Sequence, residues 1–250
     1  MGSQLVGKVA LITGASKGIG KAMAAAYAAE GAAVMLSSRK QEALDAAADE
    51  IRSVTPDARL ATFAANAGEE EQAAACVAAT IDRLGALDVL VNNAATNPVA
   101  GLTIDADLAA WDKTFKVNLR GCLVWTQYAW RSWMREHGGS VINISSIGGI
   151  SGMSGIGTYN VTKAGMIHLT KVLAEELAPG VNVNSIAPGL VKTDFARALW
   201  EPLGDEIAAN LVLPEDIAAA AVFLGSDAAS RITGHTLVVD GGALIGRGPR

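Results

Sequence analysis

Short apolar runs alternate with longer segments of helical period along the whole chain. Between the runs lie alanine-rich or amphipathic segments, such as residues 21–30, 42–54 and 111–137, which predict helices. The apolar runs have the length and composition of buried strands and lie at residues 9–12, 33–36, 60–64, 89–91, 141–144, 181–186 and 236–239. This alternation predicts an α/β fold with a parallel sheet covered by helices on both faces. Because such crossovers are right-handed, we expect a doubly wound sheet with its ligand site at the carboxyl ends of the strands.

The chain has no proline- or glycine-rich linker that would divide it, so we expect a single domain over residues 1–250. Residues 190–213 interrupt the regular alternation. They combine Phe195, Leu199 and Trp200 with charged residues and Pro202. We interpret this segment as a substrate-binding flap.

Composition excludes several classes of protein. Half of the 250 residues are apolar, which is enough for a large core. The 20 basic and 25 acidic residues give a net charge of -5, and because a nucleic-acid-binding protein usually has a basic excess, we expect no nucleic-acid partner. The apolar stretches fall short of the roughly 20 residues that span a bilayer, and we expect a cytoplasmic protein without a membrane partner. Two cysteines and three scattered histidines predict neither a disulfide framework nor a metal site.

A glycine-rich loop joins the first predicted strand to the first predicted helix. It reads Thr-Gly-Ala-Ser-Lys-Gly-Ile-Gly over residues 13–20. Glycines let the backbone turn sharply and approach a pyrophosphate at the positive helix N-terminus. An ordinary tight connection is the alternative for such a loop taken alone. The dinucleotide interpretation predicts contacts at Gly14, Ser16, Lys17, Gly18, Ile19 and Gly20.

The second predicted strand ends in Ser-Ser-Arg-Lys, at residues 37–40, without the acidic side chain that would hold a free ribose 2′-hydroxyl. Ser38 and Arg39, together with Lys17, instead offer hydroxyl and cationic groups that suit a 2′-phosphate. The sequence therefore favours NADP(H) over NAD(H), with a solvated basic turn as the alternative.

Tyr159 and Lys163 stand four residues apart in a predicted helix and so share one face. A neighbouring ammonium is expected to stabilise the phenolate and to lower the tyrosine pKa from its usual value near 10. The spacing alone is common, and a tyrosine packed on a lysine stem is its alternative. Upstream, Ser146 follows a predicted strand, and Asn118 lies in the long helix, where a local break could free backbone carbonyls and hold a water.

Together these motifs resemble the classical short-chain dehydrogenase/reductase family over residues 7–242. The resemblance also includes Asn-Asn-Ala-Ala at residues 92–95, the interval of thirteen residues between Ser146 and Tyr159, and Pro188-Gly189. It implies a Rossmann-type sheet of about seven strands in the order 3-2-1-4-5-6-7. Two residues depart from the family pattern, since Ala95 replaces a glycine and Asn66 replaces a common acid.

The resemblance implies roles for the matching residues. Tyr159 would be the general acid in ketone reduction, Ser146 would bind the carbonyl and Asn118 would support a water relay. Lys163 would lower the tyrosine pKa and hold the nicotinamide ribose. Tyr159 and Lys163 thus also belong to the expected cofactor site, whose further members are Asn66 and Ala67 near adenine, Asn93 and Ala94 along the cofactor, and Pro188, Gly189, Val191 and Thr193 near the carboxamide.

We therefore expect an NADP(H)-dependent oxidoreductase acting on a small ketone or secondary alcohol. A 3-oxoacyl thioester reductase is the main alternative, and it would need basic residues such as Arg131 and Arg135 to receive an acidic carrier protein. A non-catalytic cofactor-sensing scaffold is a further alternative. The same long helix carries four aromatic residues: Trp125, Tyr128, Trp130 and Trp133. Core packing is one interpretation of this series, and a subunit interface is the other, since the resemblance implies a homo-oligomer, dimer or tetramer, built partly through this helix.

Overall fold

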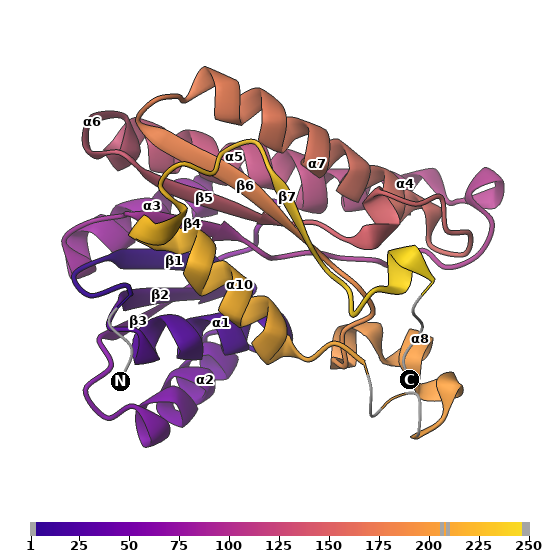
Figure 1. Cartoon of the computed structure of the whole chain (residues 1–250), viewed down its shortest axis with the longest axis horizontal. Coiled ribbons are helices and arrows are strands. Elements are labelled where there is room, and N and C mark those ends of the chain that lie inside the picture. Colours follow the sequence, from indigo (N-terminus) through magenta and orange to yellow (C-terminus); the bar gives the residue numbers. More distant parts are fainter. Residues whose placement is uncertain (1–3, 206–207, 209–210, 247–250) are drawn as a thin grey trace.

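Seven parallel strands form one sheet in the computed structural model, which describes residues 4–205, 208 and 211–246. Their order is β3-β2-β1-β4-β5-β6-β7, as expected (Figure 1). The predicted doubly wound α/β fold is thereby confirmed. The strands are β1 (Val9–Thr13), β2 (Ala33–Ser38), β3 (Leu60–Ala64), β4 (Val89–Asn92), β5 (Gly139–Ile144), β6 (Val181–Pro188) and β7 (Thr236–Val239).

Side chains of the central strands alternate between two apolar layers. In β1, Ala10 and Ile12 pack with one group of buried residues and Leu11 packs with the other. The first layer includes helices α1 (Gly18–Ala29), α2 (Gln41–Val54) and α10 (Pro214–Gly225). The second includes α3 (Glu70–Leu84), and Figure 1 shows these groups on opposite faces of the sheet. Burial on both faces explains why the strands read as continuous apolar runs.

A long helical segment on the second face contains two π-helical turns. It comprises α4 (Leu108–Phe115), the π-turn η2 (Lys116–Arg120), α5 (Gly121–Ala129), the π-turn η3 (Trp130–Met134) and α6 (Arg135–His137). The break expected near Asn118 is therefore present as a wide turn. A Cβ at Gly121 would lie 2.6 Å from the carbonyl oxygen of Ala67, so only glycine allows this close packing.

Helix α7 (Gly157–Glu176) follows β5 and packs on the same face. Short turns complete the described chain: η1 (Thr103–Asp105), η4 (Ile147–Gly149), η5 (Asp194–Ala196), α8 (Arg197–Trp200), η6 (Glu201–Leu203), η7 (Asp227–Ala229) and η8 (Ala243–Ile245). Several of them lie beyond the carboxyl ends of the strands, at the right-hand end of Figure 1.

Among its described residues, the predicted flap at residues 190–213 includes the short helical turns η5, α8 and η6. An isolated parallel bridge between Val191 and Val212 joins its two ends. Residues 206–207 and 209–210 of this segment lie outside the described residues, as do 1–3 and 247–250 of the predicted domain.

Candidate active site

The loops after β1 and β4 are locked together at the carboxyl edge of the sheet. Thr13 Oγ1 accepts hydrogen bonds from the backbone N–H groups of Asn93 (2.9 Å) and Ala94 (3.0 Å) and donates to the carbonyl oxygen of Val91 (3.2 Å). Asn93 Nδ2 donates to the carbonyl oxygen of Thr13 (2.8 Å). Thr13 therefore orders both loops, a role that the sequence interpretation missed because no spacing rule connects it with Asn93.

Two glycines make the loop between β1 and α1 possible. Gly14 has a φ of +68°, and a Cβ there would lie 2.9 Å from Asn93 Nδ2. A Cβ at Gly20 would lie only 2.2 Å from the carbonyl oxygen of Gly14. The backbone thus forms a cradle at the N-terminus of α1 that side chains would fill, and such a cradle fits the pyrophosphate of a dinucleotide.

Polar and cationic side chains flank this cradle at the end of β2. The hydroxyls of Ser16 and Ser38 are hydrogen-bonded at 3.0 Å, and Lys17 and Arg39 are exposed. Neither cation forms an ion pair with another described residue. The site therefore brings hydroxyl donors and two cations to the position where a ribose 2′-substituent is expected.

The loop after β3 is held by one hydrogen bond within the loop and by one from Trp125 of α5. Asn66 Oδ1 accepts from the backbone N–H of Gly68 (3.2 Å), and the carbonyl oxygen of Ala67 accepts from Trp125 Nε1 (3.2 Å). A carbonyl oxygen has two lone pairs, so Asn66 Oδ1 can accept a second hydrogen bond. The side-chain amide of Asn66 can therefore both donate and accept hydrogen bonds at a position where the family commonly has a carboxylate, which only accepts.

The structure distinguishes the two serines that follow β5. Ser145 is buried, and its hydroxyl donates to the carbonyl oxygen of Ile186 (2.8 Å) and accepts from the hydroxyl of Ser185 (2.7 Å). Ser146 Oγ accepts from the backbone N–H of Gly148 (3.1 Å), and Ser146 lies near enough to Tyr159 to lower the pKa of its phenol. Of the two serines, Ser146 is therefore the one whose side chain influences Tyr159.

Tyr159 and Lys163 lie on one face of the first turns of α7, with Lys163 Nζ 5.4 Å from the centre of the Tyr159 ring. Lys163 is fully buried, and its ammonium donates to the carbonyl oxygen of Ile144 (2.7 Å). Burial lowers the pKa of Lys163 to about 8. The charged form is the one that loses hydration on burial, which explains the direction of this change.

The expected decrease of the tyrosine pKa is wrong for this geometry. Burial of the phenol raises the pKa of Tyr159 to about 12, and the hydrogen bond from Ser146 lowers it by less. The ammonium of Lys163 is directed to Ile144 and lies beside the ring. Tyr159 is therefore a protonated phenol throughout the neutral range.

The side chain of Asn118, in the π-turn η2, is hydrogen-bonded to neighbouring residues. Its Oδ1 accepts from the backbone N–H of Thr96 (2.8 Å), while its Nδ2 donates to the carbonyl oxygen of Thr96 (3.0 Å) and to Thr162 Oγ1 (3.2 Å). Thr162 Oγ1 donates to the carbonyl oxygen of Tyr159 (2.7 Å). This chain of contacts connects the loop after β4 to the turn of α7 that carries Tyr159, and the contribution of Thr162 was not predicted.

The segment after β6 meets the glycine loop. A Cβ at Gly18 would lie 3.4 Å from Thr193 Cγ2, and Trp200 Nε1 donates to the carbonyl oxygen of Thr193 (2.8 Å). A Cβ at Gly189, next to Pro188, would lie 2.8 Å from Asp240 Cα. The segment after β6 therefore contacts the glycine loop at the carboxyl edge of the sheet.

Comparisons with known proteins agree with this arrangement. A family model described as enoyl-(acyl carrier protein) reductase matches residues 14–243. Human dehydrogenase/reductase SDR family member 4 is 39% identical over 246 residues, which cover 95% of this chain and 88% of the relative. The chain belongs to the short-chain dehydrogenase/reductase family.

Two further relatives show the breadth of the match. The 3-oxoacyl-(acyl-carrier-protein) reductase of Thermotoga maritima is 36% identical over 253 residues, covering 97% of this chain and all of the relative. A short-chain type dehydrogenase/reductase from Mycobacterium ulcerans has a TM-score of 0.90 and 35% identity and covers 99% of this chain and 93% of its own. As a short-chain dehydrogenase/reductase, the protein is an oxidoreductase that acts on CH–OH or carbonyl groups with NAD(P)(H).

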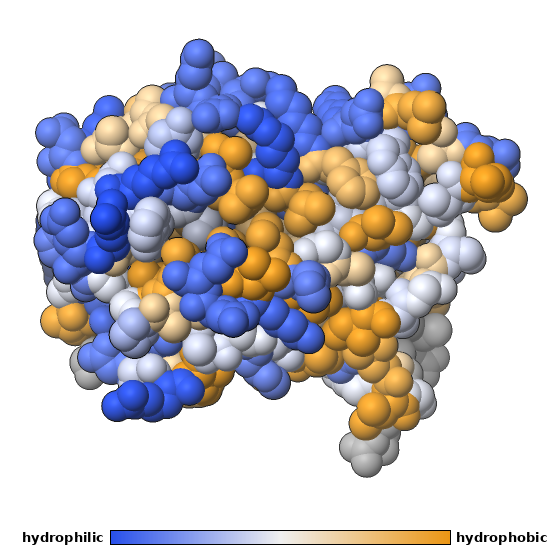
Figure 2. All heavy atoms as spheres, turned by 90° about the horizontal axis from the view of Figure 1, so that it is seen from above, coloured by the Kyte–Doolittle hydropathy of each residue, from blue (hydrophilic) through white to orange (hydrophobic). Residues whose placement is uncertain are grey.

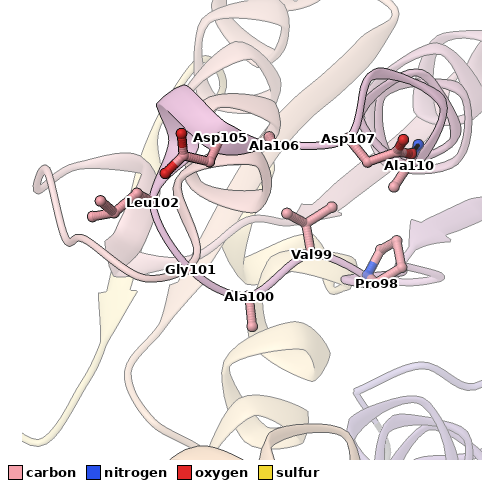
Figure 3. Close-up of a pocket in the computed structure, with 9 residues that line it drawn as sticks. All are labelled: Pro98, Val99, Ala100, Gly101, Leu102, Asp105, Ala106, Asp107 and Ala110. Atoms are coloured by element: carbon pink, nitrogen blue, oxygen red, sulfur yellow. Dashed lines mark hydrogen bonds between the residues drawn. The ribbon is translucent and has the colours of Figure 1, made fainter.

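A hollow of about 420 Å³ lies between the loop after β4 and the start of α4, as Figure 3 shows. Its lining residues belong neither to the glycine cradle nor to the first turns of α7: Pro98, Val99, Ala100, Gly101, Leu102, Asp105, Ala106, Asp107 and Ala110. The hollow therefore contains none of the predicted site residues.

The remaining expectations concern other parts of the short-chain dehydrogenase/reductase. Trp125 is buried, whereas Tyr128, Trp130 and Trp133 are half-buried along the long helix. No helix within the described ranges is long and apolar enough to cross a membrane. The same ranges contain no group of three or more His, Cys, Asp or Glu side chains placed to hold a metal ion.

Proposed function

We propose that the protein is an NADP(H)-dependent oxidoreductase of ketones and secondary alcohols in which Tyr159 is the general acid and base. The observation that carries this proposal is the position of the buried Lys163 ammonium, 5.4 Å from the centre of the Tyr159 ring, with Ser146 near enough to lower the pKa of the phenol. Bound NADP(H) supplies the hydride for reduction and accepts it in oxidation. The glycine cradle fits such a dinucleotide.

In the reduction direction, Tyr159 gives its phenolic proton to the carbonyl oxygen of the ketone. A pKa of about 12 keeps the phenol protonated at neutral pH, so the acid is available in nearly every molecule. Ser146 donates a hydrogen bond to the same oxygen and stabilises the negative charge that develops there. In the oxidation direction Tyr159 must accept the proton, so this direction is favoured as the pH increases.

Lys163 holds the reacting groups in place. Its ammonium is fixed by the carbonyl oxygen of Ile144 (2.7 Å), and its other N–H groups would hold the nicotinamide ribose. Because its pKa is about 8, the ammonium carries its charge at neutral pH. Asn118 positions the α7 turn through Thr162 and would support a water relay from its wide helical turn.

The preference for NADP(H) rests on Lys17, Arg39 and the Ser16–Ser38 hydroxyl pair. A 2′-phosphate would accept charge-assisted hydrogen bonds from the two exposed cations and from the hydroxyls. A free 2′-hydroxyl finds no carboxylate at the end of β2, which ends in Ser-Ser before Arg39. The same residues therefore favour the phosphorylated cofactor over NAD(H).

A 3-oxoacyl thioester is the second candidate substrate, and one relative's name includes this reaction. The basic residues considered for carrier docking, Arg131 and Arg135, precede β5 by a few residues. They therefore lie at the amino edge of the sheet, as α6 does at the left of Figure 1, and the site lies at the opposite edge. Arg135 also covers the ring of Trp130 at 5.4 Å. This placement favours a free ketone over a carrier-bound thioester.

We further propose that the protein forms a homo-oligomer built partly through the long helix.

Titration of the protein with NADPH and with NADH, followed by quenching of tryptophan fluorescence, tests the cofactor assignment. We expect tighter binding of NADPH and ketone-dependent oxidation of NADPH. Tighter binding of NADH would refute the 2′-phosphate assignment. Absence of binding for both dinucleotides would favour the scaffold alternative.

A further inference from the structure

Two loops that border the catalytic edge contain no charged side chain. Residues 93–104, after β4, and residues 145–158, after β5, include no Asp, Glu, Lys, Arg or His. A parallel bridge between Gly101 and Ile156 and a hydrogen bond from the N–H of Gly101 to the carbonyl oxygen of Gly155 (2.9 Å) join them. They therefore form one continuous uncharged wall in front of α7.

The flap places an aromatic residue beside Tyr159. The Phe195 ring lies 6.2 Å from the Tyr159 ring, centre to centre, with 48° between their planes. Phe195 nevertheless remains 54% exposed, so part of its ring is accessible to a ligand at Tyr159. A flat apolar group can pack against it, since aromatic pairs favour such tilted or offset contacts.

The cationic side chains of the flap already interact with other residues of the flap. Arg197 forms an ion pair with Asp194, and Lys192 Nζ lies over the Trp200 ring at 5.8 Å. Ile150 and Met153, from the uncharged loop after β5, are about half exposed. Figure 2 shows apolar residues on the surface at the right-hand end, where Figure 1 places α8 and the start of α4.

This environment discriminates against charged substrates. A carboxylate or phosphate near Tyr159 would lose hydration without gaining a cationic partner from either loop. The Lys163 ammonium beside Tyr159 is buried and already donates to the carbonyl oxygen of Ile144. An apolar ring would instead cover exposed apolar surface of Phe195 and gain free energy from its burial.

We propose that the site takes uncharged ketones that carry an apolar, ring-sized group beside the carbonyl, and that Phe195 determines this specificity by packing against the ring. This inference rests on the proposed function, because it names the substrate class of the same site. It also excludes thioesters of anionic carriers as preferred substrates.

Three ketones of defined chemistry test the inference on the protein loaded with cofactor. Acetophenone is a neutral aryl ketone, 4-acetylbenzoate adds one carboxylate to the same ring, and 2-butanone lacks the ring. For each we would measure kcat/KM with NADPH and, independently of turnover, the dissociation constant in the presence of NADP+. We expect acetophenone to have a kcat/KM about 100-fold higher and a dissociation constant about 100-fold lower than 4-acetylbenzoate, because the carboxylate loses hydration without gaining a partner.

Phe195→Ala tests the aromatic contact, with Phe223→Ala, at an exposed phenylalanine of α10 outside the flap, as the matched control. Removing the ring is expected to reduce kcat/KM for acetophenone about tenfold and to change that for 2-butanone less than about twofold. The control variant is expected to keep the wild-type ratio between the two ketones. A loss that is equal for both ketones would show a merely structural role of Phe195 and overturn its assignment.

Other outcomes separate the inference from the proposed function. Equal or tighter binding of 4-acetylbenzoate, or preferred turnover of a 3-oxoacyl thioester of coenzyme A, would overturn the substrate class while leaving the reductase in place. Tighter binding of acetophenone without reduction of any compound would refute the proposed reaction and support the ligand class.

Discussion

Replacement of Lys163 by methionine tests the energetics of the catalytic turn. Burial moves the pKa of the ammonium from 10.5 to about 8. One pKa unit corresponds to 1.36 kcal/mol, so the charged side chain destabilises the fold by about 3 kcal/mol relative to an unperturbed lysine. Methionine has a similar length and no charge, but it leaves the carbonyl oxygen of Ile144 without its donor, which costs about 1 kcal/mol.

We therefore expect Lys163→Met to increase the free energy of unfolding by about 2 kcal/mol at pH 7 while abolishing ketone reduction. The pH dependence follows from linkage. Between about pH 8 and 10.5 the folded lysine has lost its proton and the unfolded lysine retains it, so wild-type stability increases with pH in this window. The advantage of the variant should disappear by the upper end of the window.

Urea unfolding at pH 7, 8, 9 and 10, at one fixed protein concentration, measures both quantities. Lys171→Met, on the exposed face of α7, is the matched control and should show a small difference that does not change with pH. A Lys163→Met protein that is less stable than wild type at pH 7, or a stability difference that is constant across these pH values, would refute the reasoning.

Two further variants test the cofactor site. Gly20→Ala places a methyl group 2.2 Å from the carbonyl oxygen of Gly14, and we expect overpacking of about 1–3 kcal/mol to weaken NADPH binding in the titration. Gly180→Ala, whose Cβ would meet nothing within 4 Å, is its control, and equal affinity of both variants would contradict the cradle. Arg39→Ala should weaken NADPH binding about 10- to 100-fold and leave NADH binding unchanged. A parallel loss for both dinucleotides would argue against a 2′-phosphate contact.

The fold could be predicted because buried parallel strands and their crossover helices leave different periods in the sequence. All seven strands were predicted, but some of their ends were not. β5 begins at Gly139 because this residue pairs with Val181, and β6 continues to Pro188 because it pairs with Val239. The ends of a strand depend on where the neighbouring strand pairs with it, and this cannot be predicted from the local amino-acid composition.

Motifs allow residues of the candidate site to be proposed where they fix both residue type and spacing. The interval of thirteen residues before Tyr159 selected Ser146, and Ser146 is the serine that lowers the pKa of the phenol. The pKa of Tyr159 was not predictable, because it depends on how far burial outweighs the neighbouring groups in three dimensions. The link through Thr162 was likewise hidden, since its partner Asn118 lies 44 positions away in the sequence.

The central claim is that Tyr159 transfers the proton during ketone reduction. A single turnover of Tyr159→Phe, mixed with NADPH and acetophenone and followed by the absorbance of the reduced nicotinamide, tests it most directly. We expect the rate to fall by about 100-fold or more, because a general acid contributes at least this factor. The fluorescence titration with NADPH should match that of the wild type. Reduction by Tyr159→Phe at the wild-type rate would contradict the account.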